Sequence, residues 1–426
     1  MIVLCMFLGL LALVLINVPI AVALAVVASA AMLYAHGPDV LPNVALVMMD
    51  GATNFPLIAI PLFILAGAIM NSTGISRRLI AFASAIFGFV KGGLAMVNIG
   101  TSLFFAEISG SAVADVAALG SILIPSMKKK GYPGPFAAAV TSSSATLAVI
   151  IPPSIPMILY AVMAQSSVVQ LFVAGIVPGI LGGALMMFVA YRFAVHFDYP
   201  VEEVFNLKRV SETFRDAALA FTLPLIILGG IFGGFVTATE GAGLAVVAAI
   251  VIGLIYRELD WKHLRQAMVD GSVQTAVVML LVAASVLVGE YLTEAQVPQR
   301  LADGIGDITQ NKYLVLALLN LFFLVVGLFL HSAAAIILVV PIVMPLVNQV
   351  GIDPVHFGII VTLNLGIGQQ TPPVASVLVT ACSVAKADIW EVSKVNIYFI
   401  GVLFTMLMLV TYVPAIPMAL VDFFYR

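Results

Sequence analysis

Charged side chains are scarce in this chain, and their scarcity excludes the soluble protein classes. Asp, Glu, Lys and Arg make up 9% of its 426 residues, whereas soluble domains carry about a quarter. Hydrophobic residues make up 62% and the mean hydropathy is +1.18, which predicts an all-α polytopic membrane protein. The net charge of −3 gives no sign of a nucleic-acid partner, and we expect membrane lipids around most of the chain.

Cysteine and enzyme motifs are also lacking. Cys5 and Cys382 are the two cysteines, and both lie in apolar segments, so we expect no disulfide and no metal site built from cysteine. The sequence contains no HExxH, no GxSxG, no P-loop and no glycine-rich dinucleotide fingerprint. We therefore predict that the chain is not an enzyme.

The segment from Phe104 to Ser154 contains the most informative pattern that is present. Residues 93–107 are almost wholly apolar, but at about 1.5 Å per residue they reach roughly 22 Å, less than a hydrocarbon core of about 30 Å. Ser109-Gly110-Ser111 then interrupts the helix, and a second apolar run ends in three lysines at 128–130. This pattern predicts a re-entrant hairpin over 93–127 whose tip is Ser109 to Ser111.

Two prolines break the apolar run that follows. Pro152 and Pro153 have no amide hydrogen, so the carbonyls of Ala148 and Val149 lose their helical partners. Irregular backbone at membrane depth is tolerated where it lines a polar cavity, and unwound carbonyls there hold cations. We therefore predict a broken helix over 134–165 and a cation site, for which the candidate residues are Ser109, Gly110, Ser111, Ala148, Val149 and Pro152.

The same arrangement recurs 220 residues later. Pro125, Gly131, Pro152 and Pro153 are matched at this offset by Pro345, Gly351, Pro372 and Pro373. Ser111 falls on His331, so the offset predicts a second tip at 330–333 and freed carbonyls at Gly368 and Gln369. Paired interruptions in two halves indicate the binding site of a secondary transporter. The candidate residues of a second cation site are His331, Ser332, Gly368, Gln369 and Thr371.

The apolar runs divide the chain into two similar halves, 1–195 and 216–416, within one integral membrane domain over 1–426. We predict about ten spans, at 2–34, 56–70, 77–90, 134–165, 168–195, 216–234, 238–256, 263–290, 354–385 and 390–416, with the helix over 354–385 broken like its counterpart. Residues 36–54 and 295–310 read as interfacial connectors. Three spans precede each hairpin (93–127 and 313–349), which predicts an inverted repeat whose hairpins enter from opposite faces.

Basic residues test this topology through their excess on the cytoplasmic side. With the N-terminus outside, thirteen of the 18 basic residues fall inside and five fall outside. The predicted outer group is Arg77, Arg78, Arg300, Lys312 and Arg426. This bias favours two periplasmic termini.

Lys and Arg are missing from residues 101–127, 131–191 and 313–385. An anion held between these segments would meet no protein cation. Its charge must be balanced by bound cations, by helix N-termini and by hydroxyl or amide groups, which is a physical reason for coupling to a cation such as sodium. The candidate substrate contacts are Ser111, Ser154, Ser332, Gln370 and Thr371.

Four titratable residues are candidates for a functional or a structural role. Glu107 would attract a cation near the first tip or form a bond within the hairpin, and Asp115 favours the start of the following helix. Glu240 follows Thr237 at a helix start, where capping explains it as well as function does. His331 would be a ligand at the second tip or a satisfied buried histidine.

Several motifs together resemble the large membrane (M, DctM-like) subunit of TRAP transporters, the tripartite ATP-independent periplasmic uptake systems. They are Ser109 to Asp115, Ile124-Pro125, Gly131-Tyr132, Ile151 to Ser154, Gly234-Phe235 with Thr237, Thr239 and Glu240, Gly351 to Gly358, and Thr371 to Pro373. The resemblance runs nearly end to end. It implies an elevator-type secondary transporter of the bacterial inner membrane that takes up an organic acid with sodium, of the sialic acid or C4-dicarboxylate class. It also implies two partners, a periplasmic substrate-binding protein and a separate small four-helix membrane subunit.

Two other functions remain open from the sequence. A stand-alone sodium-dicarboxylate symporter would take up substrate without a binding protein, and a passive channel would conduct without sodium dependence. The sequence does not fix the substrate. For a small membrane partner, the apolar faces within 2–34 and 216–256 are the expected contact.

Overall fold

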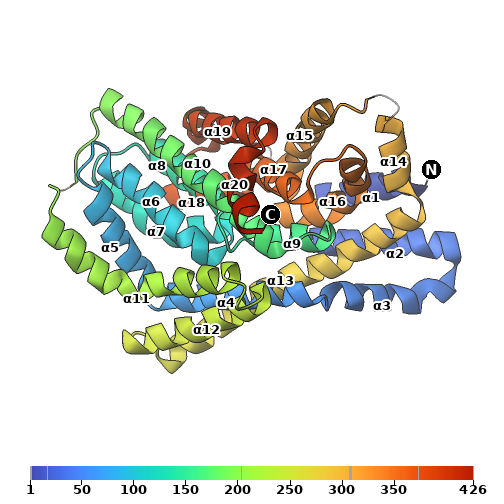
Figure 1. The fold of residues 1–426 in the computed structure, drawn as a ribbon, viewed down its shortest axis with the longest axis horizontal. Helices are drawn as coiled ribbons and strands as arrows, with labels where there is room; N and C mark the ends of the chain where they lie inside the picture. Colours follow the sequence, from blue (N-terminus) through green and yellow to red (C-terminus); the bar gives the residue numbers. More distant parts are fainter. Residues whose placement is uncertain (1, 17, 203, 307–308, 373, 426) are drawn as a thin grey trace.

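The computed structural model describes residues 2–16, 18–202, 204–306, 309–372 and 374–425. These residues fold into helices, with no strand among them. Eight of the described helices are long and apolar enough to cross a membrane. Figure 1 shows an elongated molecule in which both termini lie away from the left end.

A frame of long helices runs along the molecule. α13 (Trp261–Glu294) is unbroken, and α3 (Leu41–Ala52) and α4 (Ala59–Ser72) pack against it one after the other (Figure 1). Residues 41 and 72 fall on 261 and 292 at the offset of 220, so α3 and α4 together correspond to α13. The predicted connector over 36–54 is therefore wrong in its middle part, since α3 belongs to this frame.

The prediction of one span over 2–34 is also wrong. The structure has two helices there, α1 (Ile2–Leu15) and α2 (Ile20–His36). Pro19 precedes α2, and a residue without an amide hydrogen cannot continue α1. The two helices pack against each other, with Gly9 facing Val27. Their counterparts are α11 (Leu207–Phe232) and α12 (Ala238–Ile255), which also pack together.

The third correction concerns the predicted span over 77–90. Residues there form α5 (Ile75–Phe87), whose length is about 20 Å and too short to cross. Arg78 donates two hydrogen bonds to the Glu258 carboxylate, at 2.9 and 2.8 Å. Arg77 and Arg78 therefore lie at the same end of the molecule as Glu258, and their predicted separation from Arg257 is wrong. At the offset of 220, α5 corresponds to α14 (Val297–Gly306).

The remaining helices form a second group with matching bounds in both halves. In the first half they are α6 (Gly93–Ser109), α7 (Ala112–Lys129), α8 (Gly134–Thr146), α9 (Ile155–Met163) and α10 (Val168–His196). In the second half they are α15 (Lys312–Phe329), α16 (Ser332–Gln349), α17 (Pro354–Gly368), α18 (Ser376–Ala385) and α19 (Ile389–Tyr412), followed by α20 (Ala415–Tyr425). Both bounds of α7 map onto those of α16. The packing is reciprocal, because α7 contacts α18 and α16 contacts α9.

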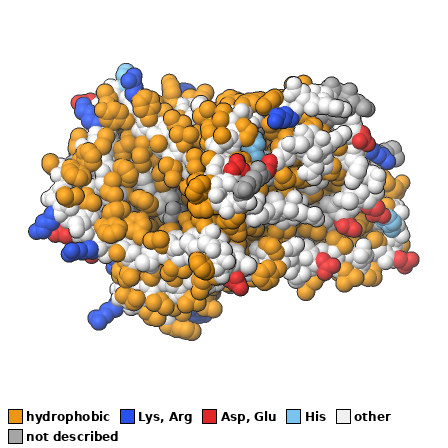
Figure 2. Space-filling model, viewed as in Figure 1, with side chains coloured by type: hydrophobic (Ala, Val, Ile, Leu, Met, Phe, Trp, Pro, Cys, Tyr) orange, Lys and Arg blue, Asp and Glu red, His pale blue; other side chains and the backbone are white. Residues whose placement is uncertain are grey.

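We call α6 with α7 hairpin one, and α15 with α16 hairpin two. Their bases lie at opposite ends of the molecule (Figure 1). The base of hairpin one is tied to the segment after α10, because Lys91 pairs with Asp198 at 2.6 Å and Lys130 with Glu202 at 3.0 Å. The hydrogen bond from Lys91 holds the pKa of Asp198 below its ordinary value. In Figure 2 the charged side chains gather mainly at the edges of the molecule, while hydrophobic side chains dominate the face between.

Candidate functional site

The tip of hairpin one packs directly on the proline loop of the first half. Gly110 has a φ of +58°, which glycine adopts at little cost. A Cβ atom at this position would lie 2.8 Å from the Pro153 carbonyl oxygen and 3.2 Å from the Ile155 nitrogen. The side chains of Ser109 and Glu107 lie outside the described residues. The structure thus brings the backbone of the first tip against the loop that the sequence predicted as its partner.

In the proline loop of the first half, a serine side chain forms a hydrogen bond with a backbone carbonyl of the same loop. A short 3-10 helix, η3 (Leu147–Val149), follows α8, and the Ser154 hydroxyl donates to the Val149 carbonyl oxygen at 2.7 Å. The same hydroxyl accepts from the Met157 amide at 3.4 Å and caps α9. Ser154 is fully buried. The Val149 carbonyl, expected to have lost its partner, is therefore bonded by Ser154.

The second tip meets the end of α17. The Gln369 side-chain amide donates to the Ser332 hydroxyl, in the first turn of α16. Behind this contact, Gly368 lies against Gly327 of α15, since a Cβ on Gly368 would approach the Gly327 backbone to 2.4 Å. The Gly368 carbonyl accepts from the Thr371 amide at 3.0 Å and that of Gln369 from the Val377 amide at 3.2 Å. Both carbonyls predicted to be free thus have backbone partners, and Pro373 lies outside the described residues.

A cavity of about 520 Å³ lies between the two tips. From the tips and the broken helices it is lined by Gly110, Ser111, Ala112, Val113, Val149, Ile155, Pro156, His331, Ser332, Ala333, Ala334 and Gln369. The first turns of α2, α7, α9 and α16 all face it, so four helix N-termini converge. No Lys, Arg, Asp or Glu is among the described residues that line the cavity, and His331 is the one titratable side chain among them.

Sequence reasoning missed the remaining wall of this cavity. It consists of Val277, Val278 and Leu281 from α13 and Pro19, Ile20 and Ala21 at the start of α2. These apolar side chains look in sequence like any side chains that face lipid, and they carry no signal of their own. The cavity therefore lies between the long-helix frame and the group of helices that carries the hairpins.

The other predicted site residues lie behind the cavity. Gln370 is fully buried and donates to the Ser142 carbonyl oxygen at 2.7 Å. The Thr371 hydroxyl donates to the Ile367 carbonyl at 3.0 Å, within its own helix end. Ala148, Pro152 and Gly368 are buried without lining the cavity. Of the five candidate substrate contacts, the structure brings Ser111 and Ser332 to the cavity wall.

The titratable candidate residues lie in different environments. Asp115 is fully buried in the first turn of α7, and its amide donates to the Ser111 carbonyl at 3.0 Å. Glu240 forms a capping box with Thr237, whose amide donates to its carboxylate at 2.8 Å. His331 is exposed toward the cavity. Among the described residues no group of three or more His, Cys, Asp or Glu could hold a metal ion.

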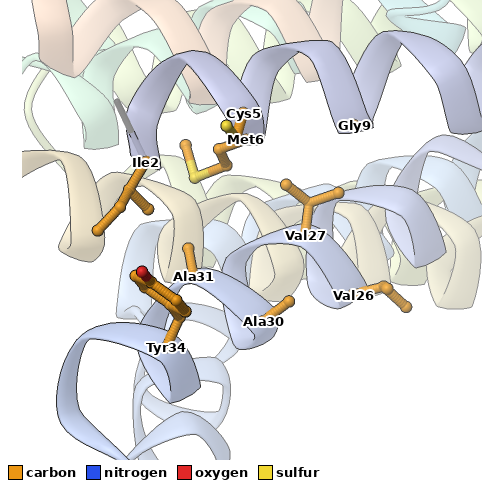
Figure 3. A pocket seen from close by; sticks show the side chains of 9 residues that line it. All are labelled: Ile2, Cys5, Met6, Gly9, Val26, Val27, Ala30, Ala31 and Tyr34. Carbon is orange, nitrogen blue, oxygen red and sulfur yellow. The ribbon is translucent and has the colours of Figure 1, made fainter.

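A second cavity, of about 460 Å³, lies between α1 and α2. Figure 3 shows its lining, with Ile2, Cys5, Met6 and Gly9 on one helix and Val26, Val27, Ala30, Ala31 and Tyr34 on the other. The Tyr34 hydroxyl and the Cys5 thiol are its polar side-chain groups. It lacks the convergent helix ends of the first cavity, so it does not suit a charged solute.

Comparison with known proteins agrees with this architecture. A family model described as "Tripartite ATP-independent periplasmic transporter, DctM component" matches residues 7–416. The isethionate TRAP transporter permease protein DctMQ of Oleidesulfovibrio alaskensis is 40% identical over 405 residues, which cover 95% of this chain and 64% of that relative. The C4-dicarboxylate TRAP transporter large permease protein DctM of Pseudomonas aeruginosa is 36% identical over 384 residues, 90% of each chain.

The sialic acid TRAP transporter permease protein SiaT of Haemophilus influenzae is 35% identical over 364 residues, which cover 85% of this chain and 59% of that protein. Among solved structures, the YdaH transporter of Alcanivorax borkumensis matches with a TM-score of 0.64 over 88% of both chains, at 16% identity. At that identity the similarity concerns the fold alone.

Proposed function

Because the chain belongs to the DctM family of tripartite ATP-independent periplasmic (TRAP) transporters, we propose that it couples the uptake of an organic acid to the entry of sodium. It is a large permease subunit and not an enzyme. The observation that carries the proposal is the cavity between the two hairpin tips, where four helix N-termini converge and no described lining residue is a Lys, Arg, Asp or Glu.

The electrostatics of this cavity favour an anion whose charge is balanced by sodium. Each helix N-terminus carries roughly half a positive charge, and unpaired amides at such ends bind carboxylates. Without a lysine or arginine in the lining, these dipoles and bound cations must together offset the charge of the substrate. Sodium would then bind before or with the acid, since its charge stabilises the carboxylate at mid-membrane depth.

The oxygen atoms at the two tips suit sodium. Site one would use the backbone of Ser109 to Ser111 with Ala148, Val149 and Pro152. Site two would use His331, Ser332, Gly368, Gln369 and Thr371. Val149, Gly368 and Gln369 already accept one hydrogen bond each, but a carbonyl oxygen has a second lone pair. Neutral oxygens of this kind are the ligands that a monovalent cation takes in unwound membrane helices.

The substrate and the partners follow from the relatives by analogy. Their names specify isethionate, C4-dicarboxylates, sialic acid and 2,3-diketo-L-gulonate, all organic acids. We propose an acid of this kind, delivered by a periplasmic binding protein. A small four-helix membrane subunit would pack on the apolar faces of α1–α2 and α11–α12, away from the hairpins.

Uptake into proteoliposomes tests this function. Both membrane subunits should accumulate the acid only with the binding protein and an inward sodium gradient, and replacing sodium with potassium should reduce uptake to that of empty liposomes. Equal uptake by this chain alone would instead indicate a stand-alone symporter. Equilibration of the acid without sodium dependence or counterflow would indicate a passive channel.

We further propose that residues 1–195 and 216–416 are inverted repeats in the bacterial inner membrane. Support comes from the matched helix bounds at an offset of 220 and from hairpin bases at opposite ends. The end with Lys91, Lys128 and Lys130 would face the cytoplasm and both termini the periplasm. The helices that carry the hairpins would then move against the frame of α13, α3 and α4, as in an elevator.

Cysteine labelling tests the inversion. In a variant that lacks Cys5 and Cys382, a cysteine at Lys129 should react with an impermeant maleimide only from the cytoplasm. One at Gln349 should react only from the periplasm, because the two residues end corresponding helices. Reaction of both from one side would remove the inverted repeat.

A further inference from the structure

Two adjacent glutamines at the end of α17 point to different parts of the molecule. Gln369 reaches the Ser332 hydroxyl and lines the cavity. Gln370 does not line the cavity and extends into the helices behind it, where it is fully buried. The sequence predicted both as ligands, but the structure gives them different surroundings.

A ring of buried hydrogen bonds holds the Gln370 side chain. Its Nε2 donates to the Ser142 carbonyl oxygen at 2.7 Å and to the Thr146 hydroxyl. Its Oε1 accepts from Asn396 Nδ2 at 3.1 Å. Asn396 in turn accepts from the Ser143 hydroxyl at 2.6 Å. Both ends of the Gln370 amide are thus bonded to α8 and α19, which belong to different halves of the chain.

The backbone beside Gln370 has little freedom of its own. A Cβ on Gly366 would lie 2.9 Å from Val149 Cγ2, and one on Gly368 would overlap the Gly327 backbone. The end of α17 therefore lies between η3 on one side and α15 on the other. The glycine contacts and the Gln370 hydrogen bonds thus act on the same short segment, which also carries Gln369 to the Ser332 hydroxyl.

We propose that Gln370 is a positioning residue, which acts through Gln369 to hold the tip of hairpin two at the cavity wall. This inference rests on the proposed function in one respect, that the cavity is where the transported acid binds. Gln370 does not touch the acid, and Gln369 with Ser332 is the contact through which it acts. The tip of hairpin one has a different support, the backbone contact between Gly110 and Pro153.

Asn98 offers a matched control. It is also fully buried, donates to the Thr141 hydroxyl at 2.6 Å and accepts from the Ser144 hydroxyl at 3.5 Å. It does not line the cavity. Gln370→Leu and Asn98→Leu each remove a buried amide of the same group of helices, but only the first should release the second tip.

Accessibility of the tip tests the positioning role without transport. Ala333 lines the cavity and is replaced by cysteine in a background that lacks Cys5 and Cys382. Maleimide labelling, without sodium or acid, should accelerate roughly fivefold in Gln370→Leu and in Gln369→Leu, the factor that one ordinary hydrogen bond corresponds to. The double variant should label no faster than either, because both changes remove the same contact. Asn98→Leu should label like the parent.

Uptake kinetics give the second readout. Gln370→Leu should raise the KM for the acid and leave kcat nearly unchanged. Added to Gln369→Leu, it should raise the KM no further. Additive effects of the two changes, or equal acceleration of labelling in Asn98→Leu, would overturn the positioning role. If Gln370→Leu fails to insert, Ser143→Ala removes one bond of the ring and should shift labelling in the same direction by less. Absence of sodium-dependent uptake in the parent would refute the proposed function, while the labelling would still decide the role of Gln370.

Discussion

Alanine at position 110 should strongly reduce uptake while leaving the protein inserted and folded. Gly110 has a φ of +58°, and an added Cβ would overlap the Pro153 carbonyl at 2.8 Å. A non-glycine residue in this region of backbone space costs about 1–3 kcal/mol before any overlap is counted. Because the added overlap is with backbone, the tip of hairpin one must move off the proline loop. We expect uptake to fall by roughly tenfold or more, the factor that about 1.4 kcal/mol corresponds to.

Gly131 provides the control for this variant. It has a φ of +89°, but a Cβ there would meet no atom within 4 Å. Gly131→Ala therefore introduces the backbone strain without the overlap and should retain most of the uptake. Equal loss in both variants would show that the contact between the first tip and the proline loop is not needed.

Alanine at position 368 should have the second large effect. The added Cβ would lie 2.4 to 2.5 Å from the backbone atoms of Gly327, so α17 and α15 must separate. Overpacking of this kind costs about 1–3 kcal/mol, and here it displaces hairpin two from Gln369. We expect loss of uptake together with a lower melting temperature in detergent.

Gly401 in α19 provides the control for Gly368→Ala, because it also lies in a helix but a Cβ there would meet nothing within 4 Å. Gly401→Ala should preserve uptake and stabilise its helix by up to about 1 kcal/mol. If Gly368→Ala transports at the parental rate, the close crossing of α15 and α17 has no part in transport.

The paired hairpin tips could be found from the sequence because their signals are chemical. Three prolines and one glycine recur at one fixed offset in both halves, and serine and glycine interrupt the apolar run at the first tip. The structure has α7 and α16 with bounds that differ by 220 at both ends. Hydropathy alone would have assigned α16 as an ordinary span, since it is long and apolar enough to cross a membrane.

The early helices were harder to predict because hydropathy does not show where an apolar chain turns back. Residues 2–34 are continuous in hydropathy, and Pro19 was the one signal that α1 and α2 are separate helices. For residues 77–90 the offset of 220 already argued against a span, because it maps them onto 297–310, a segment expected to be a connector. Reading the two halves together would have removed this span.

The roles of Gln369 and Gln370 could not be separated from the sequence. They are neighbours beside the same proline pair, and both are amides suited to a polar solute. Which one faces the cavity depends on how the end of α17 packs between η3 and α15. Gly366 and Gly368 make these contacts, with residues that lie far away in the sequence. Ser154 was misplaced for a similar reason, since a serine before a helix caps it as readily as it binds a ligand.

The ring around Gln370 also has a consequence for biosynthesis. Ribosomes release the hydroxyl partners on α8 long before the two amides, and a hydroxyl in a helix can bond its own backbone meanwhile. The Thr146 hydroxyl does so in the finished protein, with the carbonyl of Ser142. When Gln370 and Asn396 leave the translocon, their partners on α8 are therefore already in the bilayer. Synthesis in the reverse order would leave both amides facing lipid until α8 arrived.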